Sequence, residues 1–187
     1  RRFDLKIKLL KNTDCDGLFE MAPEPKSWAS WSEALADHAT ITFQWPAMYA
    51  AYLGPSALAP DEIEAVMLTV NSVNSCSFCT GLHGELGRMS GIEKPYELDM
   101  ASSVSQCVAL CKNPAAHAPA VKYARVFAAQ DGRGAEHASA FAALAAATTS
   151  GHAGSVRALC WFMYWGSVTG NTINAALGKQ KPRTGAG

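Results

Sequence analysis

Two cysteines and a histidine stand close together in the run Cys-Ser-Phe-Cys-Thr-Gly-Leu-His, which spans residues 76 to 83. Cys76 and Cys79 have the Cys-x-x-Cys spacing of redox motifs, in which two thiols form and break a disulfide. In a helix, Cys79 and His83 are at positions i and i+4 and share one face, and Cys76 lies one turn before Cys79. We predict a helix-borne redox site that reduces a peroxide or shuttles electrons through a reversible disulfide.

Proton transfer at this site depends on the start of the helix and on two further side chains. Unpaired N–H groups and the positive end of the helix dipole favour a thiolate and lower a thiol pKa from about 8.5, and Cys76 gains most from this effect. His83 lies deeper in the helix, where it can exchange a proton with Cys79 directly or through a water. Glu64 is the candidate for the group that orients His83.

The helix that carries Glu64 is predicted from a start signature and an apolar stripe. Residues 60–62 are Pro-Asp-Glu. Proline is well suited to the first turn of a helix, and the positive end of the helix dipole stabilises acidic side chains there. The apolar residues that follow have helical spacing: Ile63, Val66, Met67 and Val70. We expect this helix to end near Asn71.

The next helix is predicted to carry the cysteines and the histidine. Asn74 and Ser75 are both good N-cap residues, so the helix is expected to begin at Cys76. Gly91 is well placed as the residue that follows its C-terminal end. The cysteine motif is therefore expected to open a helix.

Helical periodicity dominates from Ser27 onward, and no alternating strand pattern competes with it. Pro46 is well placed as the first residue of one helix, and Gly54 and Pro55 break the pattern. Further helices are predicted over residues 98–112, 118–129, 137–149 and 154–177. The fold class is predicted to be all-α, with three parts: an N-terminal arm (1–26), a single helical domain (27–178) and a C-terminal tail (179–187).

Composition narrows the functional classes. The chain is 49% hydrophobic and 17% charged, as in globular proteins, and its 16 Lys and Arg balance its 16 Asp and Glu. This balance gives no electrostatic support for a nucleic-acid partner. The longest apolar run, residues 158–165, is shorter than the roughly 20 residues that span a bilayer, so we predict no transmembrane segment.

The six cysteines lack the density and regular spacing of a disulfide-stapled secreted domain. This usage favours thiol chemistry in a reducing compartment. The sequence begins at Arg1 and is basic at its start, so we expect that a leader was removed or that the sequence was trimmed. The compartment stays open between the cytoplasm and an organelle stroma or matrix reached after removal of a leader.

The motif residues carry a resemblance to a known family. Glu64, eleven residues, Cys76-x-x-Cys79, three residues and His83 resemble the alkylhydroperoxidase D-like and carboxymuconolactone decarboxylase superfamily. The resemblance covers most of residues 40 to 178, and the run Gly-Asn-Thr-Ile-Asn at 170–174 is similar to the family's last helix. It implies an all-α, usually homo-oligomeric protein that takes a peroxide as substrate and an external dithiol as reductant, with no other cofactor and no metal.

The resemblance also implies roles for the four residues: Cys79 peroxidatic, Cys76 resolving, and Glu64 with His83 relaying protons. The dipole argument instead makes Cys76 the better thiolate, so the sequence leaves the order of the two cysteines open.

Two positions depart from the family's pattern. Phe78 stands where the peroxidase prototype has a second histidine between its cysteines, and Asn71 stands where many members have serine. Members that decarboxylate the muconolactone lack the cysteine pair, so the resemblance does not imply that reaction here.

Three other interpretations compete with the redox site. Free cysteines are commonly buried and inert, so the first alternative is that Cys76, Cys79 and His83 only pack in a helical core. Packing is also how we interpret Cys107, Cys111 and Cys160, whereas Cys15 is assigned no role. Cys-x-x-Cys is also a zinc-ligand spacing, but the chain has no second pair with it. The third is a non-catalytic structural subunit of a larger assembly, because the aromatic-rich extension before Ile41 exceeds what a minimal domain needs.

Overall fold

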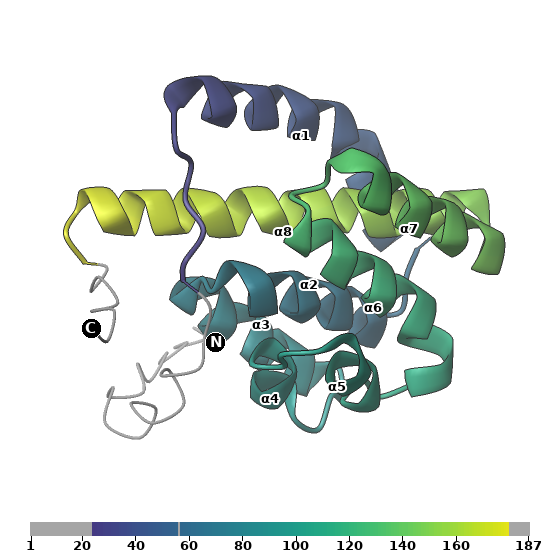
Figure 1. Ribbon diagram of the computed structural model, residues 1–187. Helices are drawn as coiled ribbons and strands as arrows, with labels where there is room; N and C mark the ends of the chain where they lie inside the picture. Colours follow the sequence, from purple (N-terminus) through teal and green to yellow (C-terminus); the bar gives the residue numbers. More distant parts are fainter. Residues whose placement is uncertain (1–23, 56, 180–187) are drawn as a thin grey trace, which may run out of the picture.

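The computed structural model describes residues 24–55 and 57–179, which form helices and no strand (Figure 1). The all-α prediction is confirmed for these residues. Residues 1–23, with Cys15 and most of the predicted arm, and residues 180–187 of the predicted tail lie outside the described part. The helices are α1 (Trp31–Leu53), α2 (Pro60–Asn74), α3 (Ser77–Met89), α4 (Pro95–Asp99), α5 (Val104–Ala109), α6 (Pro114–Ala129), α7 (Gly134–Ala147) and α8 (Ser150–Ala176).

The longest helix, α8, runs through the middle of the fold. In Figure 1, α1 lies along one side of α8 and α2 and α6 lie along the other, with α4 and α5 farthest from α1. The helix α7 packs on α6 and α8, and α3 packs on α2. None of the described helices combines the length and the hydropathy needed to span a bilayer.

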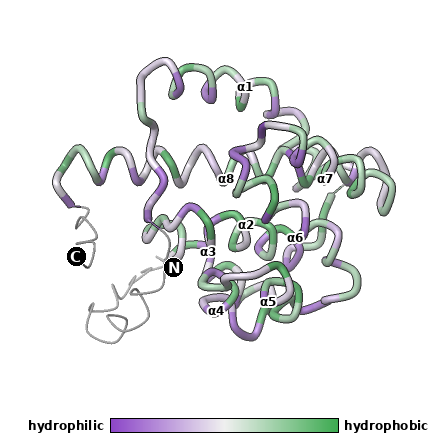
Figure 2. Tube along the Cα trace, viewed as in Figure 1, coloured by the Kyte–Doolittle hydropathy of each residue, from purple (hydrophilic) through white to green (hydrophobic). Residues whose placement is uncertain are grey.

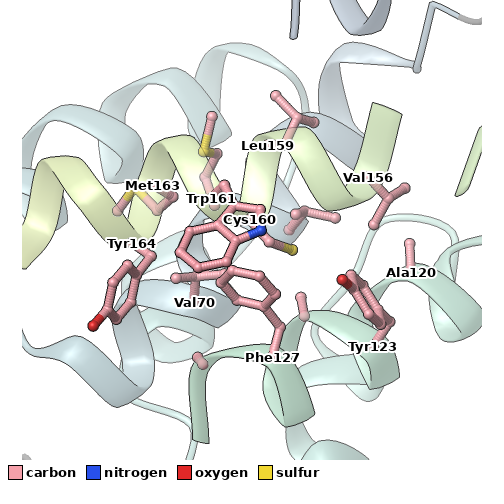
Figure 3. Close-up of a cluster of buried hydrophobic side chains, with 14 of the residues drawn as sticks. Val70, Ala120, Tyr123, Phe127, Val156, Leu159, Cys160, Trp161, Met163 and Tyr164 are labelled. Carbon is pink, nitrogen blue, oxygen red and sulfur yellow. The ribbon is translucent and has the colours of Figure 1, made fainter. Parts of the chain in front are cut away.

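The main core fills the space between α2, α6 and α8. Phe127 of α6 meets Trp161 of α8 edge to face, with ring centroids 5.1 Å apart (Figure 3). Such aromatic pairs add about 0.5–1.5 kcal/mol beyond the area they bury. Cys160 is fully buried in the same cluster, in the packing role expected of it.

The helix α2 is buried on both faces. One face joins the main core, and the other packs on a second cluster that includes Leu68, Ile92, Leu98 and Val121. In the hydropathy view, α2 therefore lies among hydrophobic segments of its neighbours (Figure 2). Its polar side chains, Glu64 among them, have little access to solvent and must find partners inside the protein.

Several predicted boundaries were wrong. Pro46 lies inside α1 and does not begin a helix, because Ile41 and Met48 on either side of it are buried and hold the helix together across the proline. Pro46 itself is exposed, so water can bind the carbonyl that its missing N–H leaves unpaired. The predicted helix over residues 98–112 is two short helices, because the Ser103 side chain accepts a hydrogen bond from the Gln106 N–H and starts α5 anew.

The remaining elements are close to expectation. The helix α2 begins at Pro60 as predicted but continues to Asn74, three residues beyond Asn71. Similarly, α6, α7 and α8 begin at Pro114, Gly134 and Ser150, each three or four residues before the predicted starts. These differences move the ends of the helices, and each of the four predicted helices is present.

Candidate redox site

The junction between α2 and α3 places Cys76 at the start of α3. Ser75 adopts the left-handed conformation (φ 56°, ψ 48°), and its N–H donates to Asn71 O at 2.8 Å, which ends α2. Asn74 is still part of α2, and its side-chain amide donates to Ser167 Oγ. The prediction that Asn74 or Ser75 is the N-cap of the helix that carries the cysteines, α3, was therefore wrong. Cys76 itself is the N-cap, with its Sγ accepting the Cys79 N–H at 3.4 Å.

This geometry gives the two thiols different pKa values. The Cys79 thiol donates a hydrogen bond to the Cys76 sulfur, and the N–H groups of Cys79 and Phe78 add to it; together they lower the pKa of Cys76 to about 7, although burial opposes the shift. The pKa of Cys79 is raised, because its proton is held in that hydrogen bond and because the side chain is buried. Both are free thiols, Cys76 fully buried and Cys79 6% exposed.

Asn71 clamps the peptide groups of Cys76. Its Oδ1 accepts the Cys76 N–H at 3.1 Å, and its Nδ2 lies 3.2 Å from Cys76 O. The same Nδ2 donates to Asp99 Oδ1 at 2.8 Å. The residue that departs from the family's pattern is thus an anchor of the cysteine loop.

Asp99, the last residue of α4, is the site residue that sequence reasoning missed. Its Oδ2 accepts the Thr80 hydroxyl at 2.6 Å, and the carboxyl is 7% exposed. Burial raises the pKa of Asp99 to about 6, although Thr80 and Asn71 stabilise the carboxylate. No motif marks Asp99, because it ends a five-residue helix far along the chain from the cysteines.

Glu64 and His83 form a second pair beside the thiols. His83 Nδ1 lies 2.8 Å from Glu64 Oε2, and both side chains are largely buried. When Nδ1 carries the proton of the neutral imidazole, it donates a hydrogen bond to the Glu64 carboxylate and leaves Nε2 free to accept a second proton. Glu64 also acts on Tyr52 at the end of α1, where burial and the nearby carboxylate raise the pKa of the phenol.

The helix α8 covers the other side of the junction. A Cβ built on Gly170 would lie 3.4 Å from Cys76 Sγ, so α8 passes directly against the sulfur. Asn171 donates to Asn74 O at 2.8 Å and to Lys26 O at 3.0 Å. The chain segment before α1, α8 and the α2–α3 junction therefore meet beside the dithiol.

The structure brings the four predicted residues together as two hydrogen-bonded pairs, Cys76 with Cys79 and Glu64 with His83. Both pairs lie on α2 and α3, and among the described residues the hydrogen bonds of His83 reach Glu64 and neither sulfur. Within residues 24–55 and 57–179, no group of three or more His, Cys, Asp and Glu side chains has the arrangement of a metal site.

Comparisons with protein-family models, curated proteins and solved structures find no match for this chain. The resemblance to the alkylhydroperoxidase D-like superfamily stays a prediction that rests on the motif residues.

Proposed function

We propose that this protein is a thiol-dependent peroxidase or disulfide oxidoreductase with a fold of the alkylhydroperoxidase D-like type. The observation that carries the proposal is the pairing at the start of α3, where one buried sulfur of lowered pKa accepts hydrogen bonds from the second thiol and from backbone N–H groups. A sulfur in this setting is a thiolate for much of the time at neutral pH, and the thiolate is the reactive form.

The proposed cycle balances as follows. The thiolate attacks one oxygen of a peroxide ROOH, the O–O bond breaks, and a sulfenic acid and the alcohol ROH form after the leaving oxygen takes a proton. The second thiol then attacks the sulfenic sulfur, which forms the Cys76–Cys79 disulfide and releases water. An external dithiol restores the two thiols by exchange and becomes a disulfide itself.

Glu64 and His83 serve as the proton relay in this proposal. With Nδ1 bound to Glu64, the Nε2 atom of His83 is available to take the proton of Cys79, one turn earlier on the helix, or to pass a proton to the leaving oxygen through water. Glu64 orients the ring, as the third group of a nucleophile–base pair does.

Two orders of attack lead to the same disulfide. The resemblance assigns attack to Cys79, which has the small residual exposure, whereas the lowered pKa supports Cys76. Stopped-flow mixing of the reduced protein with hydrogen peroxide and with an organic hydroperoxide separates them. The Cys→Ser variant that retains the attacking residue still consumes one equivalent of peroxide, and the other variant does not. Unchanged rates in both Cys76→Ser and Cys79→Ser would contradict the proposal.

A second candidate function is that of a structural subunit in a larger assembly. It is supported by large apolar side chains that α1 exposes: Trp31, Leu35, Phe43 and Leu53 are each at least 69% exposed. Exposed apolar side chains of this size are commonly covered by a partner.

Native mass measurement of the protein from its source distinguishes the two candidates. A stable complex with unrelated subunits and no peroxide turnover would favour the structural subunit, and a homo-oligomer with turnover would favour the enzyme.

A further inference from the structure

A buried network links α4 to the cysteine loop without involving Glu64 or His83. Asp99 accepts hydrogen bonds from Asn71 at 2.8 Å and from Thr80 at 2.6 Å. Each of these two residues also bonds the Cys76 backbone: Asn71 binds its N–H and its carbonyl, and the Thr80 hydroxyl lies 3.2 Å from the same carbonyl. The Asp99 carboxyl is therefore linked to the Cys76 backbone through a single intervening side chain, that of Asn71 or that of Thr80.

The packing of α3 on α4 fixes the position of this carboxyl. A Cβ on Gly84 would lie 2.4 Å from the Tyr96 ring, and one on Gly87 would lie 3.1 Å from Pro95 Cβ. The two glycines let α4 approach α3 closely, and larger residues there would move α4 and Asp99 away from the cysteine loop.

The charges that face Asp99 come mainly from α3. Its carboxylate disfavours ionisation of both Cys76 and Cys79, and His83 stabilises its charged form. Arg125 of α6 binds carbonyl groups beyond Asp99, those of Ala101 and Ser102. Asp99 and a thiolate at Cys76 are thus two negative charges inside one poorly solvated site.

We propose that Asp99 is a positioning residue of the dithiol, which fixes the Cys76 peptide through Asn71 and Thr80 and whose charge opposes the thiolate. The inference rests on the proposed function in treating the cysteine pair as redox-active. Since the disulfide is neutral, a charge that destabilises the thiolate favours the oxidised pair, which makes the dithiol a better reductant.

The first test uses the full chain, iodoacetamide as the probe, and mass spectrometry of the Cys76 peptide across a pH series. In Asp99→Asn, the midpoint of Cys76 alkylation is expected to fall by about one pH unit, because the neutral amide removes the repulsion. Glu97→Gln alters an exposed carboxylate of the same helix and is expected to leave the midpoint in place. A folded Asp99→Asn protein with an unchanged or higher midpoint would overturn the proposal.

The second test needs no substitution. In the wild-type chain, the carboxyl titration of Asp99 is followed by carbon NMR in the reduced and the disulfide forms. Because Cys76, with a pKa of about 7, ionises after Asp99, with a pKa of about 6, the Asp99 signal of the reduced form is expected to shift a second time near pH 7, and that of the disulfide form is not. A reduced form without this second step would overturn the proposal.

Neither test involves a peroxide, so the two proposals fail separately. A shifted Cys76 midpoint and a second Asp99 step without peroxide turnover would refute the peroxidase and leave the role of Asp99 in place. Turnover with neither of them would refute the role of Asp99 alone.

Discussion

The part of the chain that the structure describes contains two buried cysteine pairs, Cys76 with Cys79 and Cys107 with Cys111, and the surroundings shift the pKa values of Cys76 and Cys111 in opposite directions. Cys76 stands at the N-terminal end of α3 and accepts hydrogen bonds, which lower its pKa to about 7. Cys111 follows the C-terminal end of α5, and its thiol donates to Cys107 O at 3.2 Å. Burial, Cys107 and the carboxylates of Asp61 and Glu62 raise the pKa of Cys111 to about 12.

The difference shows that burial alone does not decide whether the pKa of a thiol is raised or lowered. Cys76 and Cys107 are equally inaccessible, at 0% exposure. At Cys76 the hydrogen bonds from the Cys79 thiol and the backbone N–H groups outweigh burial, whereas at Cys107 burial outweighs the charge of Arg125 and the hydrogen bonds of Thr69 and Ser72. The hydrogen bond between the two thiols, supported by the backbone N–H groups at the start of α3, therefore distinguishes the candidate redox pair from the packing pair.

The largest expected effect is the contrast in reactivity between the two pairs. At pH 8, the pKa values above give a Cys76 that is mostly thiolate and a Cys111 with a thiolate fraction of about one in ten thousand. A thiolate of higher pKa is the stronger nucleophile, which offsets part of this difference, so iodoacetamide should modify Cys76 on the order of a hundredfold faster, as followed by mass spectrometry of the two peptides. Comparable rates at the two sites would remove the distinction between the pairs.

A proton relay is the second feature that sets the first pair apart. In Glu64→Gln, we expect the rate of peroxide consumption to fall about a hundredfold, because an amide can donate to Nδ1 as well as accept from it and no longer keeps Nε2 of His83 free to accept a proton. The matched control is Glu62→Gln on the same helix, where a buried carboxylate pairs with His152 at 3.1 Å. Equal losses in the two variants would indicate damage to α2 and not a relay.

The two thiols of the first pair are expected to depend on each other. Cys79→Ala removes the strongest cause of the lowered Cys76 pKa, so that pKa should rise toward its ordinary value. Alkylation of Cys76 at pH 7 should then slow about tenfold. Cys111→Ala is the control and should leave the Cys76 midpoint unmoved, whereas a shift there would show that the two pairs are coupled.

The smallest expected effect is on stability, and its sign differs between the pairs. The folded pKa of Cys76 is lowered, so its contribution is full above the unfolded value of 9.0 and is lost as the pH falls through about 7. Urea unfolding should show wild type gaining on the order of 1–2 kcal/mol over Cys76→Ala between pH 7 and 9.

The folded pKa of Cys111 is raised, so its contribution is full below 9.0 and is lost as the pH rises toward 12. Against Cys111→Ala, wild type should therefore lose stability above pH 9. The same sign of pH dependence in both comparisons would contradict the assigned acidities.

The sequence predicted the helices well where a local pattern carries the information. Helical periodicity marks α2, and i, i+4 spacing relates Cys79 to His83. The contact between Glu64 and His83 could be anticipated only from the motif, since their helices meet through packing that no local pattern specifies.

What the sequence did not predict depends on tertiary contacts. Pro46 remains within α1 because α8 holds the helix on both sides of it, and Cys76 becomes a cap because Ser75 adopts a left-handed turn. Asp99 joins the site only through the docking of α4, so its role has no local signature.

The central claim, that Cys76 and Cys79 form a redox-active pair, is tested most directly by thiol titration with and without peroxide. The reduced protein is treated with one equivalent of hydrogen peroxide, unreacted thiols are counted, and disulfide-linked peptides are identified by mass spectrometry. We predict the loss of two thiols per chain and a disulfide between Cys76 and Cys79, with Cys107, Cys111 and Cys160 still reduced. An unchanged thiol count, or a loss confined to the other cysteines, would contradict the claim.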